Sequence, residues 1–169
     1  ALRAGDRLGL TSAPMKIATV TCRELPEPDH DQEPLSAGLR AAGHEESLVA
    51  WDDPEADWAA FDLVVIRSTW DYHRHLERFL AWVRATGARA NLHNPAETVA
   101  WNAHKRYLLD LAERGIPTVP TALVPVGSDQ QLQPLCEERG WTDVVIKPAA
   151  SAGSYMTHRA GAADWGAGE

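Results

Sequence analysis

Residues 63–73 read LVVIRSTWDYH, and this stretch decides the fold because an unbroken apolar run leads directly into a polar segment. Residues 63–66 are all aliphatic, which is typical of a strand that is covered on both faces in a parallel sheet. Residues 67–73 then place charged, hydroxyl and aromatic side chains directly after that strand. Because ligands of open α/β sheets bind at the carboxyl ends of the strands, residues 67–73 are a candidate binding segment.

Strands and helices alternate on both sides of this stretch. Short apolar runs predict strands at residues 15–21 (MKIATVT), 47–51 (SLVAW) and 90–93 (ANLH). Apolar residues at helical spacing predict two amphipathic helices, which Gly43 and Gly87 close. Their apolar faces consist of Leu35, Leu39 and Ala42, and of Leu76, Phe79, Leu80 and Val83. The alternation predicts an α/β fold, with a Rossmann-like domain and a parallel sheet over residues 15–99.

The chain changes character after Pro95. The elements expected there are a helix at 102–114, a strand at 118–124, a helix around Leu135, a strand at 143–147 (DVVIK) and a small-residue loop at 149–154 (AASAGS). Two strands and two helices seldom form an independent domain, so residues 100–169 are expected to be the start of a second, incomplete domain. Residues 1–14 show no period, and we expect them to be a disordered extension outside the fold.

Composition and charge disfavour several classes of protein. The chain has 169 residues, of which 44% are hydrophobic and 24% are charged, and its net charge is −8. This acidic charge disfavours binding to nucleic acid and to anionic membranes, and no apolar run approaches the ~20 residues of a membrane-spanning helix. Cys22 and Cys136 form no C-x-x-C motif, which favours a reducing compartment and a cytoplasmic location. No G-x-G-x-x-G motif follows the first strand, which disfavours a dinucleotide-binding enzyme.

Two lysines and a glycine-containing loop carry a resemblance to a known superfamily. One lysine is near a helix start in residues 102–107 (NAHKRY), and the other ends a strand in residues 145–148 (VIKP), just before residues 151–154 (SAGS). In this spacing the chain resembles the ATP-grasp superfamily. The RSTWDYH segment is similar to the branch that includes glutathione-synthetase-like proteins and the cyclo-ligase of cycloserine biosynthesis.

The resemblance implies that Lys105, Lys147, Ser151 and Gly153 bind ATP. The chemistry of these residues agrees, because a nucleoside triphosphate carries about four negative charges and needs cations that can reach it. A lysine at the end of a buried strand holds its ammonium at the ligand-binding edge of the sheet, and Gly153 lets backbone N–H groups approach a phosphate. Lys147 taken alone could equally be a strand-end lysine that extends to solvent.

The segment after residues 63–66 also supplies candidate substrate-binding residues, which are Arg67, Ser68, Thr69 and Asp71. Arg67 can bind a substrate carboxylate through two parallel N–H donors. Ser68 and Thr69 can add hydrogen bonds, and Asp71 can orient Arg67 or a substrate amine. The alternative is a turn in which the aromatic residues of the segment serve local packing.

The resemblance implies an ATP-dependent ligase that joins a small-molecule carboxylate to an amine through an acyl phosphate, with Mg2+ as a second cofactor. The magnesium ligands are expected beyond Glu169, so no metal ligand or catalytic residue is assigned, and the chain alone is expected to be inactive. The alternative is a non-catalytic α/β module that binds a small carboxylate through Arg67, or a partner through apolar surface. Neither nucleic acid nor membrane is an expected partner, whereas self-association could occur if core residues are exposed.

Overall fold

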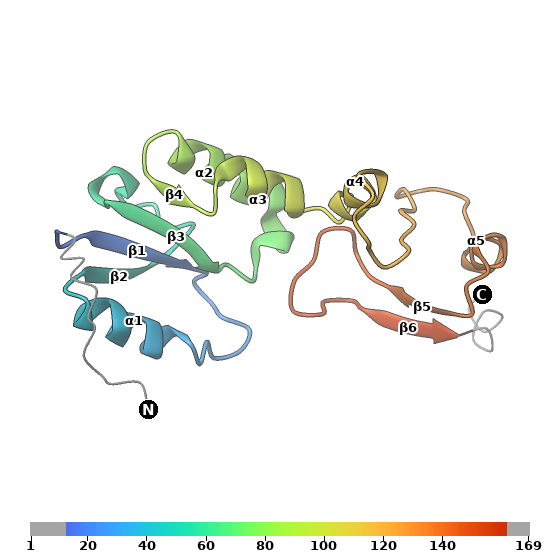
Figure 1. Cartoon of the computed structure of the whole chain (residues 1–169), viewed down its shortest axis with the longest axis horizontal. Helices are drawn as coiled ribbons and strands as arrows, with labels where there is room; N and C mark the ends of the chain where they lie inside the picture. The colour runs from blue at the N-terminus through green and yellow to red at the C-terminus, as the bar shows by residue number, and fades with distance from the viewer. Residues whose placement is uncertain (1–12, 162–169) are drawn as a thin grey trace, which may run out of the picture.

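The computed structural model describes residues 13–161, and its first part is built on a four-stranded parallel sheet (Figure 1). The strand order is β2-β1-β3-β4, and every neighbouring pair is parallel. The strands are β1 (Lys16–Thr21), β2 (Glu45–Ala50), β3 (Leu63–Ser68) and β4 (Leu92–His93). The helices of this part are α1 (Gln32–Ala41), α2 (Leu76–Gly87) and α3 (Ala96–Asn102). The predicted α/β fold with a Rossmann-like parallel sheet is confirmed, while the extension expected at residues 1–14 falls, up to residue 12, outside the described residues.

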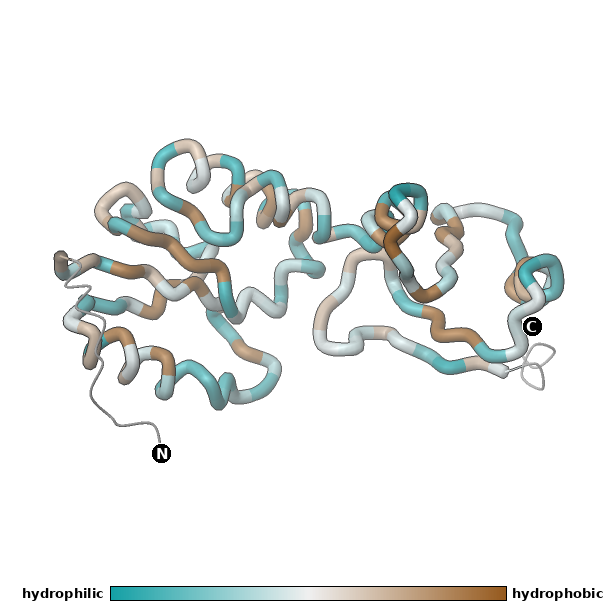
Figure 2. Tube along the Cα trace, viewed as in Figure 1, coloured by the Kyte–Doolittle hydropathy of each residue, from teal (hydrophilic) through white to brown (hydrophobic). Residues whose placement is uncertain are grey.

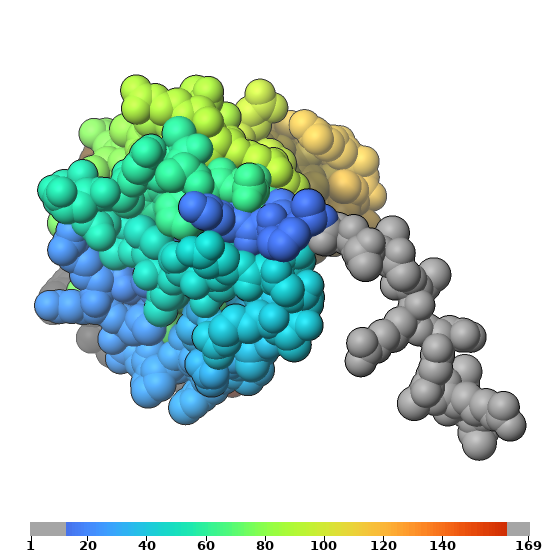
Figure 3. All heavy atoms as spheres, turned by 90° about the vertical axis from the view of Figure 1, so that its left-hand side faces the viewer, coloured from blue at the N-terminus to red at the C-terminus, as the bar shows by residue number. Residues whose placement is uncertain are grey.

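Helices cover both faces of this sheet. Successive side chains of a strand point to opposite faces, so β1 contacts helices on both sides. On one side Val20 is fully buried and belongs to the same core as Phe79 of α2. On the other side Thr19 accepts a hydrogen bond from Gln32 of α1. In the end-on view this N-terminal segment, coloured blue to green, forms a rounded body (Figure 3). None of the helices that the structure describes is long and apolar enough to cross a membrane.

An aromatic cluster fills the space between the end of β2 and α2. Trp51 is 2% exposed and meets Phe79 edge to face, with 5.4 Å between the ring centroids. The ring centroid of Trp82 lies 5.5 Å from that of Phe79 and 5.3 Å from that of Trp58. The indole N–H of Trp51 donates to Asp71 at 2.9 Å, which ties the segment after β3 to the core. These tryptophans serve packing, as the sequence suggested.

The second part contains a two-stranded antiparallel sheet (Figure 1). Its elements are α4 (Tyr107–Glu113), α5 (Leu132–Arg139), β5 (Asp143–Ile146) and β6 (His158–Gly161). The strand β5 is coloured largely brown in Figure 2 because most of its residues are hydrophobic, yet Val145 and Ile146 are 59% and 42% exposed. Among the described residues, β5 is therefore covered far less than β1.

Two expectations for the second part are wrong, and one strand was not predicted. The helix predicted at residues 102–114 begins only at Tyr107, as α4, and a turn at residues 103–106 separates it from α3, which ends at Asn102. Residues 118–124 form no strand, because Pro117 and Pro120 lack the N–H donor that a sheet ladder requires. The strand β6 was not predicted, since its sequence HRAG has no apolar alternation. The domain boundary near Val99 stays a prediction, and α3 runs across it.

Replacing Phe79 by alanine is expected to lower the free energy of unfolding by about 3–5 kcal/mol, because it removes a buried ring and leaves a cavity. Phe79 is 2% exposed and contacts the rings of Trp51, Tyr72 and Trp82. Urea unfolding followed by circular dichroism measures the loss. Leu48→Ala is the control, since Leu48 of β2 is 49% exposed, and it is expected to change stability by about 0.5 kcal/mol or less. Equal losses in the two variants would contradict this core.

Candidate functional site

Arg67 and Ser68 at the end of β3 both donate hydrogen bonds to one carboxylate, that of Asp29. Nη2 of Arg67 lies 2.9 Å and 3.2 Å from the two carboxylate oxygens of Asp29, and the hydroxyl of Ser68 donates to one of them. Asp29 comes from the loop after β1, and its side chain is only 7% exposed, against 26% for Arg67. The described structure therefore brings two of the predicted substrate-binding residues together around an internal carboxylate.

The pKa of Asp29 is lowered from its ordinary value. The hydrogen bond from Ser68 is the main cause, and the backbone N–H of Asp31 and the charge of Arg67 act in the same direction, while burial opposes them. Asp29 is therefore ionised near neutral pH and forms a charge-assisted pair with Arg67. Sequence reasoning missed Asp29, because it is one of several acids in the segment ELPEPDHD and nothing local distinguishes it.

Gln32 extends this arrangement across the sheet. Its side-chain oxygen accepts a hydrogen bond from Nε of Arg67 at 3.3 Å. Its side-chain nitrogen donates to Thr19 at 3.3 Å and to Glu46 of β2 at 3.0 Å. Nε and Nη2 of Arg67 are thus engaged by Gln32 and Asp29, whereas Nη1 makes no hydrogen bond among the residues that the structure describes. The plane of the guanidinium is held while one of its N–H groups stays available for a ligand.

Thr69 and Asp71, the other predicted substrate-binding residues, have different surroundings. Thr69 is 5% exposed. Asp71 accepts the hydrogen bond from Trp51. The sequence suggested that Asp71 could orient Arg67, but the carboxylate that pairs with Arg67 is that of Asp29. Burial, and then the negative charge of Asp71, raises the pKa of Cys22. The thiol of Cys22 is therefore protonated near neutral pH and is a poor nucleophile.

The predicted nucleotide-binding residues gather in the second part of the chain. Nζ of Lys105 donates to Oγ of Ser151 at 2.7 Å, and the backbone N–H of Lys105 donates to Ala149 at 2.7 Å. Lys105 lies in the turn between α3 and α4, whereas Lys147 directly follows β5. Burial, and then the positive charge of Lys147, lowers the pKa of Lys105. Lys105, Lys147 and Ser151 therefore form a cationic cluster, which we call the lysine cluster.

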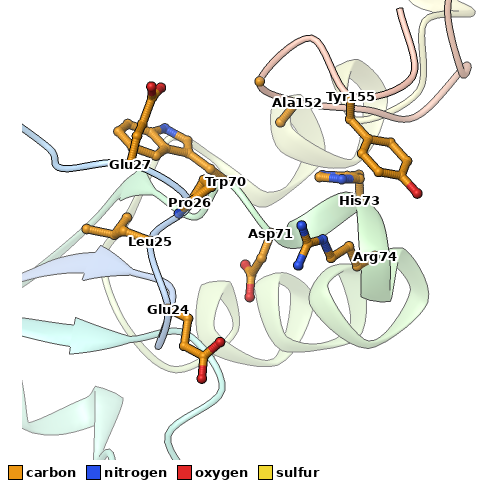
Figure 4. Close-up of a pocket in the computed structure, with 11 residues that line it drawn as sticks. Glu24, Leu25, Pro26, Glu27, Trp70, Asp71, His73, Arg74, Ala152 and Tyr155 are labelled. Carbon is orange, nitrogen blue, oxygen red and sulfur yellow. The ribbon is translucent and has the colours of Figure 1, made fainter.

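A cleft of about 500 Å³ lies between the two parts of the chain (Figure 4). The segment after β3 and the loop that contains Gly153 both line it, although they are about 80 residues apart in the sequence. The imidazole of His73 packs against the ring of Tyr155 in a tilted arrangement, with 4.8 Å between the centroids and 42° between the ring planes. The lining residues are Glu24, Leu25, Pro26, Glu27, Trp70, Asp71, His73, Arg74, Ala152, Gly153 and Tyr155.

Of the predicted site residues, only Asp71 and Gly153 line this cleft. Sequence reasoning missed the contributions of Glu24, Glu27 and Arg74, for which no local motif gives a signal. Within residues 13–161, no three His, Cys, Asp or Glu side chains come together in a way that could hold a metal ion.

The fold defines an α/β domain of the Rossmann-like class, with a cluster of polar residues at the carboxyl edge of its sheet. Residues 17–94 match the family model for the N-terminal domain of D-cycloserine synthetase DcsG. The cycloserine biosynthesis protein DcsG of Streptomyces lavendulae is 38% identical over 101 residues, which are 60% of this chain and 34% of that protein. The crystal structure of D-cycloserine synthetase DcsG matches with a TM-score of 0.81 and 30% identity, over 90% of this chain and 52% of that chain.

The chain is therefore homologous to DcsG. It spans about half the length of the solved DcsG chain and about a third of the curated relative. The resemblance of the RSTWDYH segment to the cycloserine-biosynthesis branch is confirmed to this extent, while membership of the ATP-grasp superfamily stays a prediction.

The variant Asp29→Asn is expected to lower the free energy of unfolding at pH 7 by about 1–3 kcal/mol, because it leaves the partly buried Arg67 without its counter-charge. The pKa of Asp29 is depressed in the folded state, so its contribution is present above the unfolded value of about 3.9 and is lost as the pH falls through the lower folded value. The difference between wild type and variant should therefore shrink on acidification. Urea unfolding at pH 7 and at pH 3 measures it.

Asp143→Asn is the matched control. Asp143 also pairs with an arginine, Arg159, but the two side chains are 62% and 79% exposed. An exposed ion pair contributes about 0–1 kcal/mol, so the control should change little at either pH. A loss in Asp29→Asn that stays constant from pH 7 to pH 3 would contradict the role assigned to its charge.

Proposed function

We propose that this chain supplies the substrate-side domain and the beginning of the ATP-binding domain of an ATP-dependent ligase, which joins a small-molecule carboxylate to an amine through an acyl phosphate. Homology to a synthetase supports a ligase. The observation that carries the proposal is the lysine cluster, which brings together the ammonium groups of Lys105 and Lys147: the backbone N–H of Lys105 donates at 2.7 Å to Ala149, two residues after Lys147. Ser151 holds the ammonium of Lys105 at 2.7 Å.

Two neighbouring cations repel each other, and a bound polyanion relieves that repulsion. Neither Lys105 nor Lys147 forms an ion pair with a carboxylate among the described residues. Their charge is therefore available to the phosphates of a nucleotide. Gly153, which has a φ of +56°, and the small residues beside it leave room for backbone N–H groups to approach a phosphate.

ATP, when bound, would supply the phosphoryl group that activates the carboxylate. Lys105 and Lys147 would neutralise the negative charge that develops on the phosphates. Arg67 would hold the substrate carboxylate through Nη1, with Ser68 and Thr69 beside it, and Asp71 at the cleft would face the amine. Asp29 keeps the guanidinium oriented throughout. The residues that the structure describes offer no group of three metal-ligating side chains.

A non-catalytic binding module is the second candidate. The exposure of Val145 and Ile146 on β5 favours it, because an apolar strand surface is a potential partner surface. The codons that follow Glu169 in the source DNA discriminate between the two functions. A reading frame that continues with paired acidic residues and an asparagine supports the ligase, and a stop codon directly after Glu169 supports the module.

The lysines give a direct test of the nucleotide site, because the sequence contains three of them, Lys16, Lys105 and Lys147. In NMR titrations of the 13C-lysine-labelled chain with ATP, the signals of Lys105 and Lys147 should move together while that of exposed Lys16 stays in place. We expect a dissociation constant weaker than the low micromolar range, since the part of the chain that the structure describes offers no group of three metal-ligating side chains to support the phosphates. Lys105→Gln should weaken binding further, and Lys16→Gln is the matched control. Equal movement of all three signals would contradict the site.

The pH dependence of this binding follows from the pKa of Lys105, which burial and Lys147 lower. A bound phosphate stabilises the charged form and raises that pKa, so binding takes up protons. Affinity for ATP should therefore fall as the pH rises through the pKa of Lys105 in the free chain. The same titrations at several pH values measure the effect, and an affinity that rises with pH over that range would oppose the assignment.

A further inference from the structure

One side chain of the segment after β3 reaches the loop of the lysine cluster. Tyr72 begins the short 3₁₀ helix η2 (Tyr72–His75), and its hydroxyl donates a hydrogen bond to the backbone carbonyl of Ser151 at 3.3 Å. Nζ of Lys105 lies 3.5 Å from the same carbonyl and 2.7 Å from Oγ of Ser151. Tyr72 and Lys105 are therefore both bonded to one loop residue.

The neighbouring residue of η2 makes a second contact with the same loop. The imidazole of His73 packs at a tilt against the ring of Tyr155, and both of its ring nitrogens are buried without a hydrogen-bond partner among the described residues. Figure 4 shows the two rings next to each other among the residues that line the cleft. Because unpaired buried nitrogens cost free energy, His73 contributes at this place through the area of its ring rather than through its polar atoms.

The loop itself does not favour the conformation that it adopts. Ser154 and Met156 have φ values of 56° and 48°, in the left-handed region that residues other than glycine rarely occupy. Tyr155 and Met156 are 45% and 59% exposed, so burial of their own side chains offsets little of this strain. Besides the loop's own hydrogen bonds, Tyr72 and His73 contact it from outside.

We propose that Tyr72 is a positioning residue for the lysine cluster: its hydroxyl fixes Ser151, and Ser151 fixes the ammonium of Lys105, while the ring of His73 docks Tyr155. The segment that was expected to bind substrate would thus also set the geometry of the nucleotide-binding side. The contacts stand by themselves, and only their consequence for ATP rests on the proposed function. A purely structural role of Tyr72 would lie in its ring, which packs 5.4 Å from that of Phe79.

Tyr72→Phe separates the two roles, because it keeps the ring and removes only the hydroxyl. Tyr107→Phe is the matched control, since Tyr107 lies close enough to Tyr72 to help raise its pKa, after burial, and its hydroxyl has no hydrogen-bond partner among the described residues. In the 169-residue chain, Tyr72→Phe should speed hydrogen exchange about two- to tenfold at the amides of Tyr155 and Thr157, which donate within the loop. It should also move the NMR titration of Lys105 to higher pH, because a looser loop leaves the ammonium better hydrated.

Both measurements are made without nucleotide, so they test the positioning role independently of ATP binding. Unchanged exchange and an unchanged Lys105 titration in Tyr72→Phe would overturn the proposal, as would equal changes in Tyr107→Phe. If ATP then fails to shift Lys105 in the wild type, the nucleotide role fails while the positioning role stands. If ATP binds Tyr72→Phe as tightly as the wild type, the consequence for nucleotide binding is overturned.

His73 offers a second, independent pair of variants. His73→Phe keeps an aromatic ring against Tyr155 and removes the two unpartnered nitrogens, so exchange at Tyr155 and Thr157 should stay at the wild-type rate or become slower. His73→Ala removes the ring and should speed that exchange about two- to tenfold. Equal acceleration in both variants would show that an imidazole nitrogen holds the loop, and the docking role of the ring would be wrong.

Discussion

A carboxylate that is almost fully shielded from water must find hydrogen-bond donors within the protein, and Asp29 finds them at the end of β3. Arg67 and Ser68 both donate to it, so the loop after β1 has to return across the carboxyl edge of the sheet. The helix α1 begins three residues later at Gln32, whose side chain holds Nε of Arg67. One buried charge thus sets the course of the loop, the start of α1 and the plane of the guanidinium, and Nη1 of Arg67 is left for a ligand.

The lysine cluster is organised by a neutral group instead. Ser151 receives hydrogen bonds from Lys105 and from Tyr72 but carries no charge. Its loop contains two residues in the left-handed region, and the sheet beside it leaves Val145 exposed. The geometry of this cluster therefore depends on contacts from the first part of the chain, whereas the Asp29 pair is self-contained.

Elements with a strong local signal could be predicted, and contacts over long distances in the sequence could not. The run at residues 63–66 and the helical face that contains Phe79 are visible because burial imposes a period on neighbouring positions. Lys105 and Lys147 could be named from a resemblance, but their proximity depends on how the chain folds around β5. The hydrogen-bond partners of Asp29 are 38 and 39 residues away in the sequence. Nothing in the sequence distinguishes Asp29 from the neighbouring acids, because only the folded structure shields its side chain. Residues 118–124 are apolar enough to indicate a strand, but Pro120 within the segment and Pro117 just before it lack the N–H donor that a sheet requires.

The two cationic centres differ in net charge, and we propose that this difference determines which ligand each centre binds. Arg67 is neutralised by Asp29, so it offers directed N–H donors with little net charge, which suits a single carboxylate. Lys105 and Lys147 have no carboxylate partner among the described residues, so their charge is uncompensated and favours a polyphosphate. The net charge of −8 repels polyanions from the chain as a whole, but salt screens that repulsion beyond about 10 Å. A polyanion therefore gains electrostatic binding free energy only where it contacts uncompensated cations directly. This favours phosphates at the lysine cluster, and a single carboxylate at Arg67.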